Sequence, residues 1–321
     1  MKKRNPRHGS MQFWPRVKAK KPHARIRSWT KQKKGVLGFA GYKIGMTHLM
    51  ITDNKPTSQS KGKKIFCPAS LIECPSIKVA AVNFYKKSRA VLRISSQIMA
   101  QNLDKELKSK MSLPKKQKNL EFPEFDDLRL LVYTQPRLTG VGKKKPEVFE
   151  MEIGGSKEEK SSYAKEKLGK EISIEEVFQE GEQIDVHAVT KGRGFTGPVK
   201  RFGITLKSHK SEKNRRNPGS LGGWTSQGHV MYRIAHAGQH GFHQRTEYNK
   251  HLLKIGKDAK EVQEKGGFLG YGLVKNPYII IKGSVPGSRK RLVKLTHAIR
   301  PDKLIPKEPP VIDYISKESK Q

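Results

Sequence analysis

The sequence has few cysteines, no long apolar run and few acidic side chains for its length. Cys67 and Cys74 are its two cysteines, too few for a disulfide framework or a four-cysteine zinc site, which favours a reducing compartment. No run of about 18 apolar residues occurs, so no membrane-spanning helix is predicted. The first residues are charged throughout, unlike the apolar core of a signal peptide. We therefore expect a soluble protein that is not secreted and does not bind membranes.

Apolar residues are also scarce. They make up 34% of the 321 residues, below the roughly 45–50% of an ordinary globular domain. The length allows one or two domains. Part of the chain therefore lacks a core of its own, and such a segment becomes ordered when a partner binds it.

Positive charge is what the chain has in excess. Its 66 Lys and Arg residues stand against 29 Asp and Glu, a net charge of +37. A charge of this size indicates a polyanionic partner. Nucleic acid fits best, because each phosphate set against a Lys or Arg releases condensed counterions.

The positive charge is segregated along the chain. Residues 1–34 hold 13 basic side chains and no acid, residues 191–245 hold 11 with one acid, Glu212, and residues 282–300 hold six with none. Residues 101–185 are nearly neutral, with 16 basic and 18 acidic side chains. A single basic run is usually a solvated surface, but three such blocks favour a binding face.

Periodicity predicts a mostly β fold. Strand-like runs occur at 36–40, 65–73, 77–85, 128–134, 148–153, 184–190 and 278–281. The imperfect alternation of 77–85 indicates a strand covered on both faces. Met99, Leu103, Leu107 and Met111 share a four-residue spacing that predicts a helix. A second helix is expected after Ser156, which forms a capping-box pattern with Glu159, and before Gly169.

Two motifs in the basic block 191–245 resemble known sites. Residues 191–197 contain GxGxxG after a strand, as in dinucleotide-binding proteins. That fingerprint needs a helix at its glycines and an acid about 20 residues on, which the sequence does not provide. A glycine-rich loop lying against a phosphate backbone is the preferred interpretation.

Three histidines, His236, His240 and His243, have spacings that a zinc site on a helix could use. Gly238 and Gly241 argue against that helix, so we expect no metal and no cofactor. Trp224 lies in a polar loop without apolar periodicity. Packing on a small core and stacking on RNA are its two interpretations, and stacking is preferred.

Longer strings resemble a known family. Arg25-Ile-Arg-Ser-Trp29, GFAGYKIGMTH at 38–48, VTKGRGFTG at 189–197 and AGQHGFHQRTEYNK at 237–250 are similar to the large-subunit ribosomal protein family L-three, in its archaeal form. The resemblance covers nearly the whole chain. It implies a mostly β fold with an α insertion: a six-stranded closed β-barrel of the translation-protein type with long basic RNA-penetrating extensions.

The resemblance and the charge pattern together predict a domain plan. Residues 1–34 form a basic N-terminal arm, and 35–95 with 180–300 form the barrel core. A central basic finger of about 195–245 interrupts that core, 96–179 form an inserted α/β region, and 301–321 form a C-terminal tail. The resemblance further implies early assembly of the 3′ region of the large-subunit rRNA, and a finger whose tip, with Trp224, lies near the peptidyl transferase centre.

The expected partners are large-subunit rRNA and neighbouring ribosomal proteins of the L-fourteen and L-twenty-four-like families, in the cytoplasmic ribosome. Neither a membrane nor a second copy of the chain is expected. A free nucleic-acid-modifying enzyme with a site in the glycine- and histidine-rich loops is the alternative. The predicted rRNA-binding residues are Arg7, Arg16, Lys20, Arg25, Arg27, Trp29, Lys43, Lys191, Arg193, Lys200, Arg201, His209, Lys210, Arg215, Arg216, Trp224, His229, Arg233, Gln239, His243, Gln244, Arg245, Lys282, Arg289 and Arg291.

Overall fold

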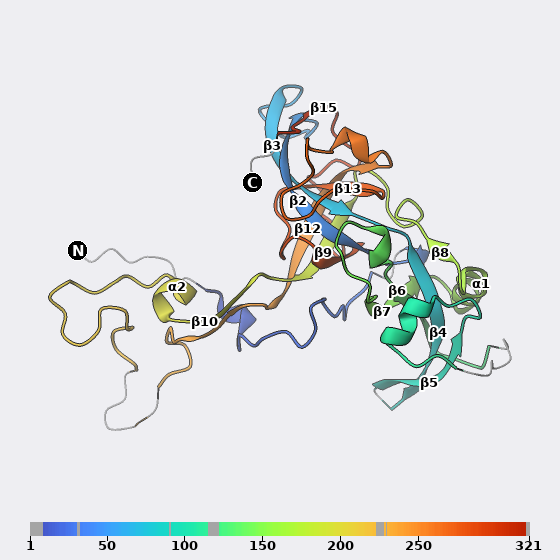
Figure 1. Cartoon of the computed structure of the whole chain (residues 1–321), viewed down its shortest axis with the longest axis horizontal. Coiled ribbons are helices and arrows are strands. Elements are labelled where there is room, and N and C mark those ends of the chain that lie inside the picture. Colours follow the sequence, from blue (N-terminus) through green and yellow to red (C-terminus); the bar gives the residue numbers. More distant parts are fainter. Residues whose placement is uncertain are drawn as a thin grey trace. The chain divides into compact units, whose positions relative to one another are not determined.

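A computed structural model describes residues 9–30, 33–89, 91–114, 122–222, 228 and 230–318. The chain forms two compact units (Figure 1). Met1–Pro22 and Val189–Gln244 form one, called here the basic unit, and His23–Ala188 with Arg245–Gln321 form the other, called the sheet unit. The basic unit thus consists of two segments that are far apart in sequence. Its second segment, Val189–Gln244, interrupts the sequence of the sheet unit.

The first sheet of the sheet unit has seven strands in the order β14-β9-β12-β13-β3-β2-β15. β14 pairs with β2 as well as with β9, so the hydrogen-bonded path through β14, β9, β12, β13, β3 and β2 returns to its start. The strands are β2 (Gly38–Thr52), β3 (Lys64–Glu73), β9 (Gln183–Val189), β12 (Gln244–Gly256), β13 (Tyr278–Lys282), β14 (Leu292–His297) and β15 (Ile312–Ile315).

The second sheet has the order β1-β7-β6-β4-β5, and β8 also pairs with β4. Residues 35–95, predicted to lie wholly in one barrel core, are therefore divided between two sheets. The chain leaves the first sheet at Glu73 and enters the second at Ile77, because β4 pairs with β5, β6 and β8 and not with β3. The strands are β1 (Gly35–Val36), β4 (Ile77–Ser88), β5 (Val91–Met99), β6 (Asp127–Tyr133), β7 (Val148–Gly154) and β8 (Glu171–Ile172).

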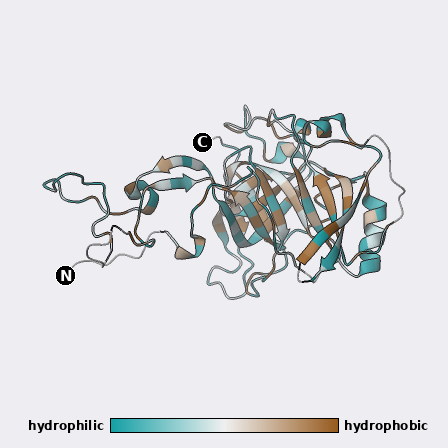
Figure 2. Cartoon of the chain, turned by 90° about the horizontal axis from the view of Figure 1, so that it is seen from below, coloured by the Kyte–Doolittle hydropathy of each residue, from teal (hydrophilic) through white to brown (hydrophobic). Residues whose placement is uncertain are grey.

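One apolar cluster joins both sheets. Phe39, Leu71 and Ile280 contribute from the first sheet and Val82 and Leu130 from the second, all almost fully buried. Figure 2 shows the corresponding concentration of apolar residues in the strands. Burying this area supplies most of the favourable free energy of folding. The central part of β4 is buried on both faces, as its imperfect alternation predicted.

The prediction of a helix from the spacing of Met99, Leu103, Leu107 and Met111 is wrong. Met99 ends β5, where it pairs with Ala81, and a short 3-10 turn, η2 (Lys105–Ser109), contains Leu107. Leu107 packs with Ala80 and Tyr133, and Leu103 and Met111 pack against the same small cluster. The four-residue spacing thus reflects packing from a strand end and a loop. The other short elements here are η3 (Pro136–Leu138) and η4 (Ala259–Glu261).

The second expected helix is confirmed as α1 (Lys157–Lys167). The Ser156 hydroxyl accepts a hydrogen bond from the Glu159 amide, and the Glu159 carboxylate accepts one from the Ser156 amide. These two bonds satisfy donors that a helix start leaves free. Gly169 follows with φ of 76°, a conformation that favours glycine.

The basic unit contains short elements in the described part of the chain. They are η1 (Met11–Phe13), β10 (Gly192–Thr196), α2 (Pro198–Phe202) and β11 (Gly238–Gly241). α2 begins directly after Gly197, so the GxGxxG stretch is followed by one short helical turn, where the sequence predicts a loop. Across both units, no helix among the described residues is long and apolar enough to cross a membrane.

Candidate nucleic-acid interface

The antiparallel ladder between β10 and β11 is the base of the basic unit. Gly192 pairs with Gly241, and Phe195 pairs with Gln239 beyond a bulge. Gly241 has φ of 71°, and a Cβ there would lie 1.9 Å from the Lys191 carbonyl oxygen. Glycine is therefore required for the strands to approach this closely.

The N-terminal arm folds against this ladder within the same unit. The Ala19 amide donates to the Phe242 carbonyl (2.8 Å), and the His243 ring donates through Nδ1 to the Val17 carbonyl (2.8 Å). Trp14 stacks on Phe202 of α2 with ring centroids 5.9 Å apart. Segments about 200 residues apart in sequence thus present one surface.

Two guanidinium groups share the ring of Phe202. Arg16 lies 4.5 Å and Arg201 5.1 Å from its centroid. Arg201 also donates to the carbonyl oxygens of Gln239 (3.0 Å) and His236 (2.9 Å). These contacts fix the position of Arg201, and partial burial lowers its pKa from the usual value.

The His240 ring lies close to these guanidinium groups and to Arg193. Burial and then the charge of Arg193 lower the pKa of His240, with smaller effects of the same sign from His243, Arg201 and Arg16. Residues 9–22 and 189–244 contain a single acid, Glu212, against 14 Lys and Arg. Positive groups held close together repel one another, and an anion placed among them lowers that repulsion.

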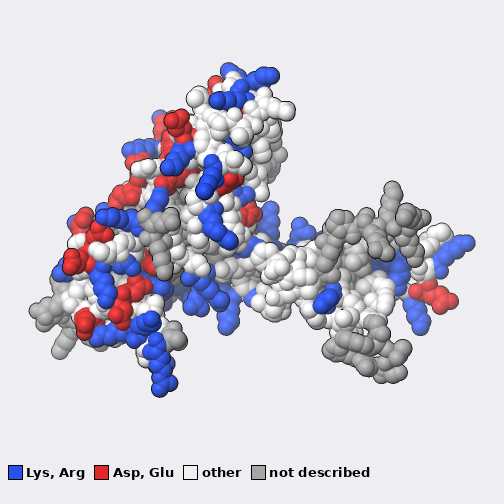
Figure 3. Space-filling model, turned by 180° about the vertical axis from the view of Figure 1, so that it is seen from behind, with Lys and Arg blue, Asp and Glu red and all other residues white. Residues whose placement is uncertain are grey.

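Acidic side chains gather on the sheet unit. Figure 3 shows red side chains over its surface, beside Lys and Arg. Many of these acids are paired with cations there, such as Lys160 with Asp127 (2.7 Å) and Lys167 with Glu176 (2.6 Å). The charge of the sheet unit is therefore partly compensated internally, whereas residues 9–22 and 189–244 of the basic unit offer a single acid for 14 Lys and Arg.

Most of the predicted basic residues of the basic unit are exposed. They extend along β10, the residues after α2 and the turns near 208–216, where the Lys207 amide donates to the Arg215 carbonyl (3.1 Å). Arg25 and Arg27, also predicted, are exposed on the sheet unit. The exposed predicted residues of the basic unit are Lys20, Lys191, Arg193, Lys200, His209, Lys210, Arg215, Arg216, Arg233 and Gln244.

Four predicted RNA-binding residues are engaged within the protein. Lys43 is 8% exposed and donates to the Val285 carbonyl. Trp29 packs against the core over Gly38. His243 is buried, and the Gln239 side-chain amide donates to the Gly241 carbonyl (3.0 Å). These four side chains stabilise the folded protein and do not project from the basic surface.

The remaining predicted residues divide into two groups. Burial lowers the pKa of Arg245 and Arg291, and Lys282 and Arg289 are also partly exposed. Arg7, Trp224 and His229 lie outside the described residues.

Exposed aromatic side chains of the basic unit were missed. Phe195 on β10 is 79% exposed, Tyr232 is 63% exposed and Phe13 is 47% exposed. Phe195 lies between Gly194 and Thr196 in a stretch without apolar periodicity, the same pattern that predicts stacking for Trp224. Exposed rings beside cations are typical of surfaces on which bases stack.

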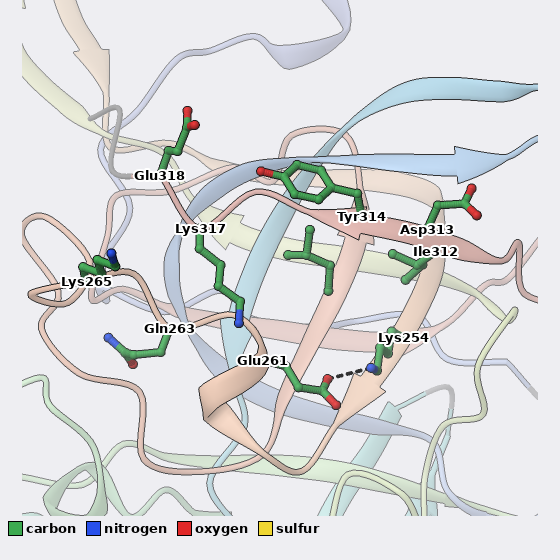
Figure 4. A pocket seen from close by; sticks show the side chains of 10 residues that line it. Lys254, Glu261, Gln263, Lys265, Ile312, Asp313, Tyr314, Lys317 and Glu318 are labelled. Carbon is green, nitrogen blue, oxygen red and sulfur yellow. Dashed lines mark hydrogen bonds and ion pairs between the residues drawn. The ribbon is translucent and has the colours of Figure 1, made fainter.

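A cavity of about 900 Å³ lies on the sheet unit, away from these residues in sequence (Figure 4). Lys254 and Glu261, next to each other in its lining, form an ion pair (2.6 Å). Its lining combines three lysines with three acids, so it lacks the uniform charge of the basic unit. The lining residues are Lys254, Glu261, Gln263, Lys265, Ile312, Asp313, Tyr314, Ile315, Lys317 and Glu318.

Known proteins are similar to this chain over its whole length. The sequence profile of the family described as Ribosomal protein L3 matches residues 1–125 and 122–321. The chain belongs to the ribosomal protein L3 family. Large ribosomal subunit protein uL3 of Methanococcus vannielii is 46% identical over 100% of this chain and 99% of its own length. The protein of the same name from Archaeoglobus fulgidus is 48% identical over 94% of each chain.

Membership of the L3 family confirms the predictions made at the level of the family. The chain is a non-enzymatic, structural constituent of the large subunit in the cytoplasmic ribosome, of the archaeal type. Its partners are accordingly large-subunit rRNA and ribosomal proteins. The alternative of a free nucleic-acid-modifying enzyme is therefore wrong.

Proposed function

We propose that the basic unit is the principal rRNA-binding part of the chain, and that the sheet unit is the rigid base that carries it. The observation that carries this proposal is the convergence of Arg16 and Arg201 on the ring of Phe202, with Arg193 close enough to lower the pKa of the neighbouring His240. These residues come from the arm and from the central segment, and one acid occurs in the two segments of that unit. A phosphodiester backbone supplies the missing negative charge.

Exposed and partly buried groups would act differently. Lys191, Arg193 and Lys200 can follow the phosphates as exposed charges, whereas Arg201 is already oriented by two carbonyl oxygens and needs little further ordering. Phe195 would stack on an unpaired base or a ribose. The exposed predicted residues listed above contribute phosphate contacts around this centre.

The finer predictions are part of the same proposal. The returning strand path of the first sheet supports a closed six-stranded barrel. The resemblance to the family supports an N-terminal arm, a central finger, an insertion and a C-terminal tail, with the arm 1–34 divided between the two units after Pro22. It also supports early assembly of the 3′ rRNA region, a tip with Trp224 near the peptidyl transferase centre, and neighbours of the L-fourteen and L-twenty-four-like families.

Salt dependence of binding to a large-subunit rRNA transcript tests the proposal. Each lost phosphate contact lowers the slope of log affinity against log salt by about one. The double substitution Lys191→Ala/Arg193→Ala should therefore reduce the slope by about two, with little change in the stability of the protein, because both side chains are exposed.

Lys257→Ala is the matched control. Lys257 is an exposed lysine of the sheet unit, 2.9 Å from Glu175. Its removal should leave the slope unchanged. Equal slopes for the wild type and the double variant would contradict the proposed role of the basic unit, even if the chain still sediments with large subunits.

A further inference from the structure

The β4–β5 hairpin extends beyond the sheet to which it belongs. β6 pairs with β4 from Lys78 to Tyr85, whereas the β4–β5 ladder continues through the pairs Lys86–Arg93, Lys87–Leu92 and Ser88–Val91. β5 is the last strand of its sheet in the order that the described residues give (Figure 1). The outer edge of β5 therefore presents backbone donors and acceptors without a partner strand in the described part of the chain.

This edge carries aliphatic side chains. Val91 is 57% exposed, Leu92 42% and Ile94 56%. Successive strand residues point to opposite faces, so Val91 lies on one face and Leu92 and Ile94 on the other. Natural edge strands usually carry charges or are short, and a two-stranded hairpin is marginal in water on its own. A partner that covers the edge would bury the aliphatic side chains and would stabilise the hairpin.

The positive charge of the hairpin limits which partners can pair with the edge. Lys86, Lys87, Arg89 and Arg93 are exposed on the hairpin, and the ion pair between Lys86 and Glu124 is long at 3.9 Å. A second copy of the chain would bring four like charges against these four. Antiparallel pairing of two such edges is therefore disfavoured.

RNA would satisfy the cations but would leave the other two features unexplained. Residues 86–96 contain no aromatic side chain for stacking on a base. Phosphates also cannot cover branched aliphatic side chains or continue a strand ladder. An extended protein segment with apolar and acidic side chains can satisfy the backbone edge, the aliphatic groups and the cations together.

We propose that the outer edge of β5, from Val91 to Ile94, docks an extended segment of a neighbouring protein that carries apolar and acidic side chains. The segment adds a strand to the second sheet through backbone hydrogen bonds. Its apolar side chains cover Leu92 and Ile94 or Val91, and its carboxylates meet Arg93 and the lysines of β4. The inference rests on the placement of the chain in the large subunit, which provides the neighbour.

Site-specific photo-crosslinking within purified large subunits tests this. The full chain carries a benzophenone amino acid at position 92, or at position 138 as the control, since Leu138 is a similarly exposed leucine (45% against 42%) of the sheet unit. Sedimentation with large subunits is measured first, and its loss in the unsubstituted chain would refute the proposed function itself. Position 91 replaces position 92 if the first variant fails to assemble.

The expected result is one discrete protein adduct at position 92 and none of that mass at position 138. The crosslinked peptide should be an extended segment that contains acids. An rRNA adduct, an adduct equally strong at 138, a second copy of this chain or no adduct at 92 and 91 would overturn the proposal.

A second measurement excludes chance proximity. Arg93→Glu and Leu92→Asp should each lower the salt-resistant retention of the crosslinked protein in large subunits several-fold. Leu138→Asp should leave its retention unchanged. Equal retention in all three variants would show that the edge is near the protein but does not bind it.

Discussion

A buried carboxylate that accepts four hydrogen bonds shows how single residues hold the sheet unit together. Glu73 at the end of β3 is fully buried. Its Oε1 accepts from the amides of Lys275 and Asn276 (both 2.9 Å) and from the Asn276 side chain (2.8 Å). The Tyr271 hydroxyl donates to Oε2. The Glu73 side chain thus provides acceptors for the polar groups of the loop before β13, in keeping with the rule that buried polar groups are hydrogen-bonded.

Substitutions at Glu73 should separate hydrogen bonding from charge. Glu73→Ala removes the acceptor of four hydrogen bonds, one of them from the buried Tyr271 hydroxyl, and should lower the free energy of unfolding by about 3 kcal/mol. Glu73→Gln keeps one oxygen for three donors, and the Tyr271 hydroxyl can accept from the new amide, so we expect a loss of about 1 kcal/mol. Urea denaturation of the full chain measures both.

Glu124→Ala provides the comparison, because the side chain of Glu124 is 94% exposed and its removal should change little. If Glu73→Gln were as destabilising as Glu73→Ala, the negative charge and not the hydrogen-bond geometry would be the stabilising factor.

Single residues also mark the limit of the sequence analysis. Net charge indicated a polyanionic partner, since it depends on composition alone, and the family resemblance identified that partner as large-subunit rRNA. It did not separate Lys191, which is exposed, from Lys43, which donates to a carbonyl inside the protein. The convergence of Arg16, Arg201 and His240 depends on the fold of a long chain. No local pattern contains that information.

At the scale of elements, local signals predicted what local contacts determine. The capping box of α1 lies within four residues and was recognised, as were the strands with continuous apolar runs. β12 was missed because its first half is polar and partly exposed, and pairing with β9 and β13 determines its conformation. The prediction of a helix at 99–111 was wrong because the apolar residues of this segment pack against β4 and β6 without forming a helix.

The capping box should have a measurable effect. Ser156→Ala removes the acceptor of the Glu159 amide and frees one donor at the start of α1, at a cost of about 1 kcal/mol. Ser162→Ala, in the middle of the same helix, is the matched control, since its hydroxyl donates to the Glu159 carbonyl and caps nothing. A lower urea midpoint for Ser156→Ala alone is expected. The same midpoint for both variants would count against the cap.

At the scale of the whole molecule, polar groups inside the sheet unit link stability to pH. His187 is buried with its ring nitrogens 2.9 Å from Thr246 Oγ1 and 3.2 Å from Thr296 Oγ1. Burial, with a smaller effect of Lys294, lowers the pKa of His187 to about 4. Burial also lowers the pKa of His251 to about 4, with a smaller effect of Lys282. Both histidines are therefore neutral in the folded protein at neutral pH.

The sign of the pH dependence follows from proton binding. Between the unfolded pKa of about 6.5 and the folded value, the unfolded chain binds more protons than the folded one. Acidification through this window therefore favours unfolding. Each histidine should therefore lower the free energy of unfolding at pH 5 by about 1–2 kcal/mol relative to pH 7.5. Carboxylates contribute mainly at lower pH, so this interval isolates the histidines.

Urea denaturation of the full chain at pH 7.5 and pH 5 measures the effect. The wild type should lose about 2–4 kcal/mol across this interval if both histidines contribute. His187→Asn/His251→Asn should be less stable at pH 7.5, yet its stability should change much less on acidification. Because the comparison is made within each variant, a general destabilisation by the substitutions does not affect it. An equal loss in the two proteins would mean that other groups take up the protons.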